Sequence, residues 1–119
     1  MARFEALITP VIDGNDLRET LDQIAQQWGG SLTWLDRHNA SLDLVSAGLQ
    51  LKFLLELRRG DDLLLLVTSR EGMGAGAPRT QELLEKLLAW ITGRMPRSQV
   101  TYRSDRGGPI RRAPQVPIR

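Results

Sequence analysis

The chain has 119 residues, 41% hydrophobic and 25% charged, with a formal net charge of +2 and no cysteine. This length and composition indicate one globular domain that can bury a core. The missing cysteine excludes disulfides, zinc–thiolate sites, iron–sulfur clusters and cysteine nucleophiles. No run approaches the ~18 apolar residues of a membrane span, and the N-terminus does not read as a signal peptide. We therefore expect a cytoplasmic protein without a membrane span.

Strands are predicted wherever apolar residues alternate with polar ones. The clearest segment is 49–58, in which alternation over ten residues outweighs the helix propensity of leucine, lysine and glutamate. Residues 63–69 are apolar on both faces, which is typical of a central strand. The other predicted strands are 2–9, which Pro10 ends, then 31–36 and 41–45, and a further short one within 98–104.

Two helices are predicted between these strands. The first begins at Asp16, whose spacing to Glu19 resembles a capping box, and it ends at Gly29 and Gly30. The second covers the segment "PRTQELLEKLLAWITGR" (78–94), with an apolar stripe at helical spacing and Gly93 as its stop.

The element order is thus β-α-β-β-β-β-α, with a further short strand near the end. The economical packing is an α+β two-layer sandwich, in which a mainly antiparallel sheet carries both helices on one face. We expect the first strand to lie beside the fourth strand of the meander. Residues 1–103 form the single domain, and residues 104–119 form a flexible tail.

The charge is unevenly distributed along the chain. Residues 1–94 carry ten Lys/Arg and thirteen Asp/Glu, a net of −3, whereas residues 95–119 carry six arginines and one aspartate, a net of +5. The segment "GGPIRRAPQVPIR" (107–119) contains three prolines and no hydrophobic period, so we expect it to be disordered or extended. A basic tail on a slightly acidic body is suited to docking on an acidic surface.

The loop "SREGMGAGAPRT" (69–80) joins a strand to a helix and is a candidate anion site. Glycines let backbone N–H groups converge on a phosphate at a helix N-terminus. The G-x-G-x-G spacing, however, matches neither the P-loop nor the dinucleotide fingerprint. We favour a mobile joint, with a contact surface or an anion site as alternatives. The residues concerned are Gly72, Met73, Gly74, Gly76 and Arg79.

The remaining chemistry-bearing residues do not form a catalytic pattern. His38 is the only histidine and lies in a predicted turn, where a surface role outweighs acid–base catalysis. Asp61 and Asp62 are typical of a hairpin turn and supply too few ligands for a calcium loop. Trp34 and Phe53 are too few, and Phe53 belongs to an apolar row, so the sheet is a poor platform for RNA. The three tryptophans are expected to pack on one another.

The sequence therefore predicts a small non-enzymatic protein-binding module: an accessory subunit, an assembly factor or an adaptor. It would dock through its tail on another protein or a larger complex with an acidic surface. The alternative is a module that binds nucleic acid or a nucleotide through the tail and the loop 72–76, although the acidic body disfavours it. A homodimer through an edge strand is a further option, and no cofactor or metal is expected. The tail residues assigned to partner binding are Arg103, Arg106, Arg111, Arg112 and Arg119.

Overall fold

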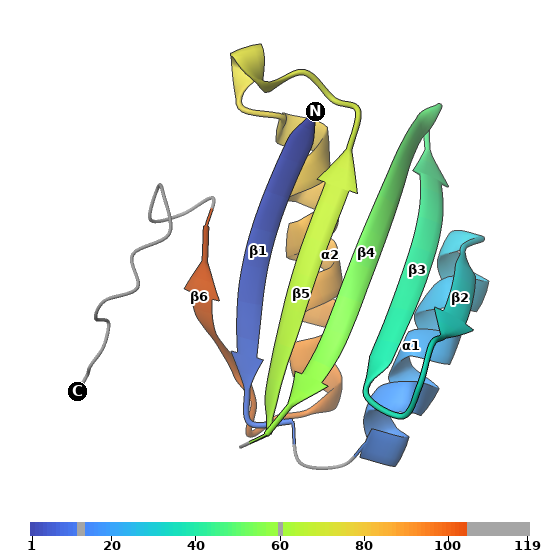
Figure 1. Cartoon of the computed structure of the whole chain (residues 1–119), viewed down its shortest axis with the longest axis vertical. Helices are drawn as coiled ribbons and strands as arrows, with labels where there is room; N and C mark the ends of the chain where they lie inside the picture. The colour runs from blue at the N-terminus through green and yellow to red at the C-terminus, as the bar shows by residue number, and fades with distance from the viewer. Residues whose placement is uncertain (12–13, 60, 105–119) are drawn as a thin grey trace.

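The computed structural model describes residues 1–11, 14–59 and 61–104. In this part of the chain the strands and helices follow the predicted order, including the further short strand (Figure 1). The strands are β1 (Ala2–Thr9), β2 (Ser31–Trp34), β3 (Asn39–Ser46), β4 (Leu49–Arg58), β5 (Asp62–Ser69) and β6 (Gln99–Arg103). The helices are α1 (Gly14–Trp28) and α2 (Pro78–Arg94), and a 3₁₀ turn, η1, spans Met73–Ala75.

The six strands form one antiparallel sheet in the order β2-β3-β4-β5-β1-β6. β2 to β5 are a meander, and β1 joins it beside β5, as predicted. β5, which is apolar on both faces, lies in the interior of the sheet, which is also confirmed. Both helices lie behind the same face in Figure 1, so the molecule is a two-layer α+β sandwich.

The core lies between the sheet and the two helices. The ten-residue alternation of 49–58 does form a strand, and Phe53 on its inner face is 0% exposed. Trp28 and Trp90 pack edge to face with ring centroids 6.2 Å apart. Trp34 instead lies under the guanidinium group of Arg18, 4.1 Å from its ring centroid. Only Trp28 and Trp90 therefore make the ring contact predicted among the three tryptophans.

The end of α1 shows why two glycines stand there. Gly29 adopts a φ of +68°, the left-handed conformation that terminates helices, and the Gly30 N–H donates to the carbonyl of Ala25 at 2.8 Å. A Cβ on Gly30 would come within 2.3 Å of the Leu44 side chain and 2.9 Å of the Asp43 carbonyl oxygen. The predicted stop is confirmed, and the second glycine is also required by close packing against β3.

Some predicted boundaries are shifted. α1 begins at Gly14, so Asp16 lies in the first turn of the helix, where its negative charge suits the helix dipole. α2 continues past Gly93 to Arg94, because that glycine does not adopt a positive φ and therefore does not reverse the chain. β2 is two residues shorter than predicted and ends at Trp34.

Ser104, the first residue of the predicted tail, is bonded to β1. The Ser104 N–H donates to the carbonyl of Glu5, and the Glu5 N–H donates to Ser104 Oγ, each at 2.9 Å. The paired structure thus extends one residue beyond the predicted boundary at residue 103. Residues 105–119, the rest of the predicted tail, lie outside the described residues. Neither described helix combines the length and apolar character that a membrane span needs.

Candidate functional site

The glycine loop connects β5 to α2 at the end of the sheet where β1 begins (Figure 1). Gly72 and Gly74 are exposed, and a Cβ on either would meet nothing within 4 Å. Gly76 has a φ of +80°, and Ala77 follows in the left-handed region at +51°. The special backbone is therefore confined to the last two residues before α2. The backbone of Met73 begins η1, but its side chain lies outside the described part of the structure.

A carboxylate from the loop itself caps the N-terminus of α2. The backbone N–H of Arg79 donates to Glu71 Oε2 at 3.0 Å, and that of Thr80 donates to Glu71 Oε1 at 2.7 Å. The methyl group of Ala77, at the N-cap position, cannot accept a hydrogen bond from these N–H groups. Glu71 therefore occupies the place where a phosphate cradle would hold its anion.

Side-chain hydroxyls complete this cap. Thr80 Oγ1 donates to Glu71 Oε1 at 2.6 Å, and it also lies 2.6 Å from Ser69 Oγ. Because the single Thr80 hydroxyl proton goes to the carboxylate, Ser69 must be the donor toward Thr80. The Glu71 N–H in turn donates to Ser69 Oγ at 3.1 Å. The loop, the end of β5 and the start of α2 are thus joined by a closed ring of hydrogen bonds.

The pKa of the Glu71 carboxyl lies below its ordinary value of 4.5. Burial raises this pKa, but the hydrogen bonds from the Thr80 hydroxyl and from the backbone N–H groups of Arg79 and Thr80, with the charge of Arg79, outweigh it. Glu71 is therefore a fixed internal anion at neutral pH. An external phosphate would have to displace it from these donors.

Arg79, predicted as an anion ligand beside the loop, is turned toward the β3–β4 turn. Its Nη2 donates to the carbonyl oxygens of Ser46 at 2.6 Å and Ala47 at 3.0 Å. Ala47 and Gly48 form that turn with φ values of +50° and +82°. The arginine thus ties two loops together at one end of the sheet.

The other predicted chemistry-bearing residues lie in turns or directly beside them. The Asp36 carboxylate accepts hydrogen bonds from the His38 backbone N–H at 2.7 Å and from the Asn39 side chain at 3.0 Å, and these bonds lower the pKa of Asp36. The His38 side chain is exposed. Asp61 adopts a φ of +65° in the β4–β5 hairpin, and β5 begins at Asp62. Within residues 1–11, 14–59 and 61–104, no His, Asp and Glu side chains form a group of three that could hold a metal ion.

One of the tail arginines assigned to partner binding belongs to the described residues. Arg103 lies in β6, and its guanidinium forms an ion pair with Glu85 of α2. With its side chain 10% exposed, it links the edge strand to the helix layer. Arg106, Arg111, Arg112 and Arg119 lie outside the described residues.

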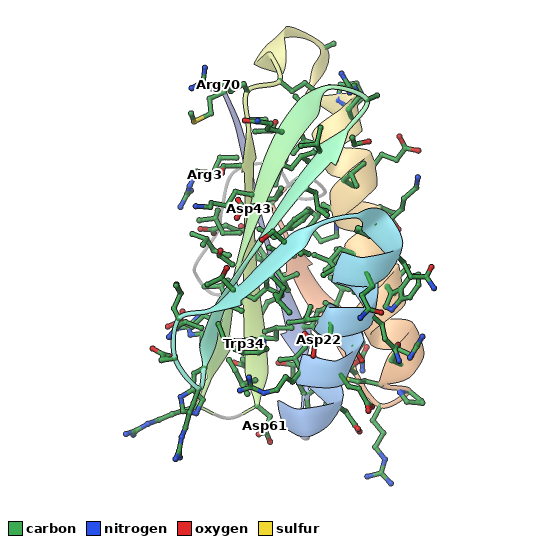
Figure 2. The ribbon with its side chains drawn as sticks, turned by 90° about the vertical axis from the view of Figure 1, so that its right-hand side faces the viewer. Arg3, Asp22, Trp34, Asp43, Asp61 and Arg70 are labelled. Atoms are coloured by element: carbon green, nitrogen blue, oxygen red, sulfur yellow. The ribbon has the colours of Figure 1, made fainter. Side chains whose placement is uncertain are left out.

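The face of the sheet opposite the helices carries no further described layer, and Arg3 and Arg70 extend from that side in Figure 2. Leucines from three neighbouring strands meet at its centre. Leu54 lies opposite Leu66, and Leu64 lies opposite Leu7. Leu54 is 38% exposed, and the other three are partly exposed. We call Leu7, Leu54, Leu64 and Leu66 the open-face leucines.

A hollow of about 380 Å³ lies beside these leucines. Leu54, Leu64 and Leu66 line it from β4 and β5, and Glu56 lines it beside them. Leu35, in the turn that follows β2, forms part of its wall and is 64% exposed. We call this cavity the leucine hollow.

A second groove, of about 600 Å³, lies at the other end of the sheet. Its charged lining residues have both signs: Asp43 stands opposite Lys52 in register, and Arg70 follows β5. The two strand aromatics considered for RNA stacking do not serve this face, since Phe53 is fully buried and Trp34 packs under Arg18. The described open face thus offers neither a basic stripe nor the predicted strand aromatics to a nucleic acid.

No protein-family model matches this chain, and no curated protein is significantly similar to it. The residues themselves are therefore the basis for inferring the function. Sequence reasoning missed both the Glu71 cap and the open-face leucines. The signal for the second was present, because Leu54 interrupts an otherwise polar series on the outer face of β4 and pairs with the outward Leu66 of β5.

Proposed function

We propose that this chain is a non-enzymatic protein-binding module whose binding surface is the open face of its sheet. The observation that carries the proposal is the group of open-face leucines beside a hollow, on a face that no described element covers. Contiguous apolar side chains rimmed by polar ones mark interaction sites on soluble proteins. An accessory subunit, an assembly factor or an adaptor would use such a surface.

The energetics favour a macromolecular ligand over a small one. Burying a leucine completely stabilises by roughly 1.5–3 kcal/mol, and each open-face leucine has part of this still to gain. These leucines extend across three strands, so a partner must cover a broad surface to bury them together. A protein surface of matching shape meets that requirement.

The basic tail is the second element of the proposal. Residues 105–119 carry four arginines and one aspartate, and guanidinium groups can bind partner carboxylates in a bidentate way. The role of these four arginines is inferred from the sequence. A nucleotide at the glycine loop has no comparable support, because Glu71 already uses the N–H groups that open α2.

Photo-crosslinking in the native host tests the proposal. A photo-reactive amino acid would replace Leu54 on the open face or, as the matched control, Asp22, which is exposed on α1 (Figure 2). We expect a discrete crosslinked protein from position 54 and none from position 22. Equal crosslinking from both positions, or none from position 54, would refute the open face as the binding surface. A second pair of proteins, ending at residue 104 or 119, shows whether the tail contributes to the crosslinked yield.

A further inference from the structure

We propose that the partner on the open face is a second copy of this chain, held in a two-fold symmetric dimer. This inference rests on the proposed function and adds the identity of the partner. In such a dimer the same patch faces itself, so one surface must supply both a protruding group and the hollow that receives it.

The rim of the leucine hollow meets this requirement. Leu35 is 64% exposed, although it borders a cavity lined by leucines of β4 and β5. A two-fold axis close to this rim would place the Leu35 side chain of each copy against the leucine hollow of the other. Leu54, the most exposed open-face leucine at 38%, would be buried in the same contact.

The charges of the face fit a second copy better than a strongly charged partner. Among the described strand residues, the outward positions of the sheet carry three cations and four anions. They are Arg3, Lys52 and Arg58, and Glu5, Asp43, Glu56 and Asp62. A surface with both signs in nearly equal number can oppose its own copy with complementary charges, whereas a nucleic acid would meet repulsion and attraction together.

The size of the face sets the expected strength of association. The length of a strand of about eight residues, multiplied by the width of the sheet at the usual spacing between strands, gives the open face an area of roughly 650 Å². Stable dimers bury about 800 Å² per partner, so this interface belongs near the lower end of the range. We therefore expect a reversible dimer whose population depends on concentration.

The edges of the sheet are the weaker alternative for self-association. β2 has four residues, and β6 has five with a register shift against β1. Such short or irregular edges offer few backbone groups in line, which is how proteins discourage edge pairing. The predicted edge-strand homodimer is therefore less favoured than a dimer through the face.

Sedimentation velocity on the purified full chain tests the inference. The variants are Leu35→Asp and Leu54→Asp, and the control is Ala89→Asp, which adds the same charge at an exposed position of α2, in the layer that covers the other face of the sheet. Circular dichroism confirms that each variant is folded. If Leu54→Asp fails to fold, Leu35→Asp in the turn still decides the question.

We expect the wild-type chain to dimerise reversibly, each leucine variant to weaken the dimer at least about tenfold, and Ala89→Asp to change it less than about threefold. A wild-type monomer at every concentration up to about 1 mM would overturn the inference, as would an Ala89→Asp effect equal to that of Leu35→Asp. If the chain is monomeric but position 54 still crosslinks to a different protein, the second copy is excluded and the proposed function stands. If it is monomeric and position 54 crosslinks to nothing, both proposals fail.

Discussion

The two faces of the sheet are built from alternate residues of the same strands, yet their surroundings differ completely. On β4 the inward residues Leu51, Phe53 and Leu55 are at most 3% exposed and pack under the helices. Their outward neighbours Lys52 and Leu54 have no described layer above them. The covered face is the core of the domain, and the open face combines leucines with charges of both signs.

This difference shows that an apolar residue in a strand can contribute either to the stability of the chain or to association with another molecule. On the covered face, a leucine contributes to the stability of the isolated chain. On the open face, a leucine of equal size contributes little to that stability and retains surface that only another molecule can bury. Substitutions on the two faces should therefore separate stability from association.

The largest effect is expected from Phe53→Ala. Removing a fully buried ring leaves a cavity under the helices, so the free energy of unfolding should fall by about 3–5 kcal/mol. Leu54→Ala, the next residue on the opposite face, should cost less than about 1 kcal/mol, and Lys52→Ala less than about 0.5 kcal/mol. Urea unfolding at low protein concentration, where association does not contribute, measures all three. Similar losses for Phe53→Ala and Leu54→Ala would show that the faces are not distinct.

Thr80→Val tests the polar contact inside the covered layer. Thr80 is 0% exposed and links Glu71 to Ser69, so valine would leave a buried hydroxyl and a carboxylate oxygen short of one partner. We expect a loss of about 1–3 kcal/mol by urea unfolding. Thr33→Val, at an exposed position of β2 on the open side, is the control and should stay within about 0.5 kcal/mol. Equal costs would mean that the ring of hydrogen bonds does not stabilise the fold.

The sequence predicted the covered face well and the open face poorly, for a physical reason. Period-two alternation and the apolar stripes of the helices are local patterns, and they determine which residues turn inward. Whether the outward side of β5 meets a further layer depends on the number of helices and on where they lie. The apolar character of Leu64 and Leu66 therefore indicates, from the sequence alone, only that the strand is central.

The glycine loop shows a similar limit. Its glycines were visible in the sequence and suggested an anion site, but the anion that occupies the helix N-terminus is Glu71 from the same loop. Ala77 at the N-cap position, with no side-chain oxygen, was the available signal that a cap had to come from elsewhere. Glu71 caps a helix that begins several residues later, and such a cap has no fixed spacing in the sequence. The sequence pattern alone therefore could not identify Glu71 as the cap.

The glycines of this loop should differ in their tolerance of alanine. Gly76 has a φ of +80°, so Gly76→Ala should cost about 1–2 kcal/mol through backbone strain. Gly74 has open space at its Cβ and no positive φ, so Gly74→Ala should change stability by less than about 0.5 kcal/mol. Thermal or urea unfolding of the two variants compares them directly. A larger loss of stability for Gly74→Ala than for Gly76→Ala would show that Gly74, and not Gly76, is the position of the loop that requires glycine.

The smallest effect, and the most specific, is expected from Glu71→Gln as the pH changes. The pKa of Glu71 is lowered in the folded protein, because the bonds from Thr80 and Arg79 and the charge of Arg79 outweigh the effect of burial, so folding favours the ionised carboxylate. Its contribution to stability is therefore fully present above the unfolded-state pKa, ordinarily 4.5, and is lost as the pH falls through the lower folded-state pKa.

Glutamine has no charge to lose. The melting temperature of the wild-type chain should exceed that of Glu71→Gln at pH 7, and the difference should shrink on acidification below pH 4.5. A difference in melting temperature that stays constant from pH 7 into the acid range would show that the carboxylate charge does not cap α2. The N-terminus of α2 would then again be a candidate site for an external anion.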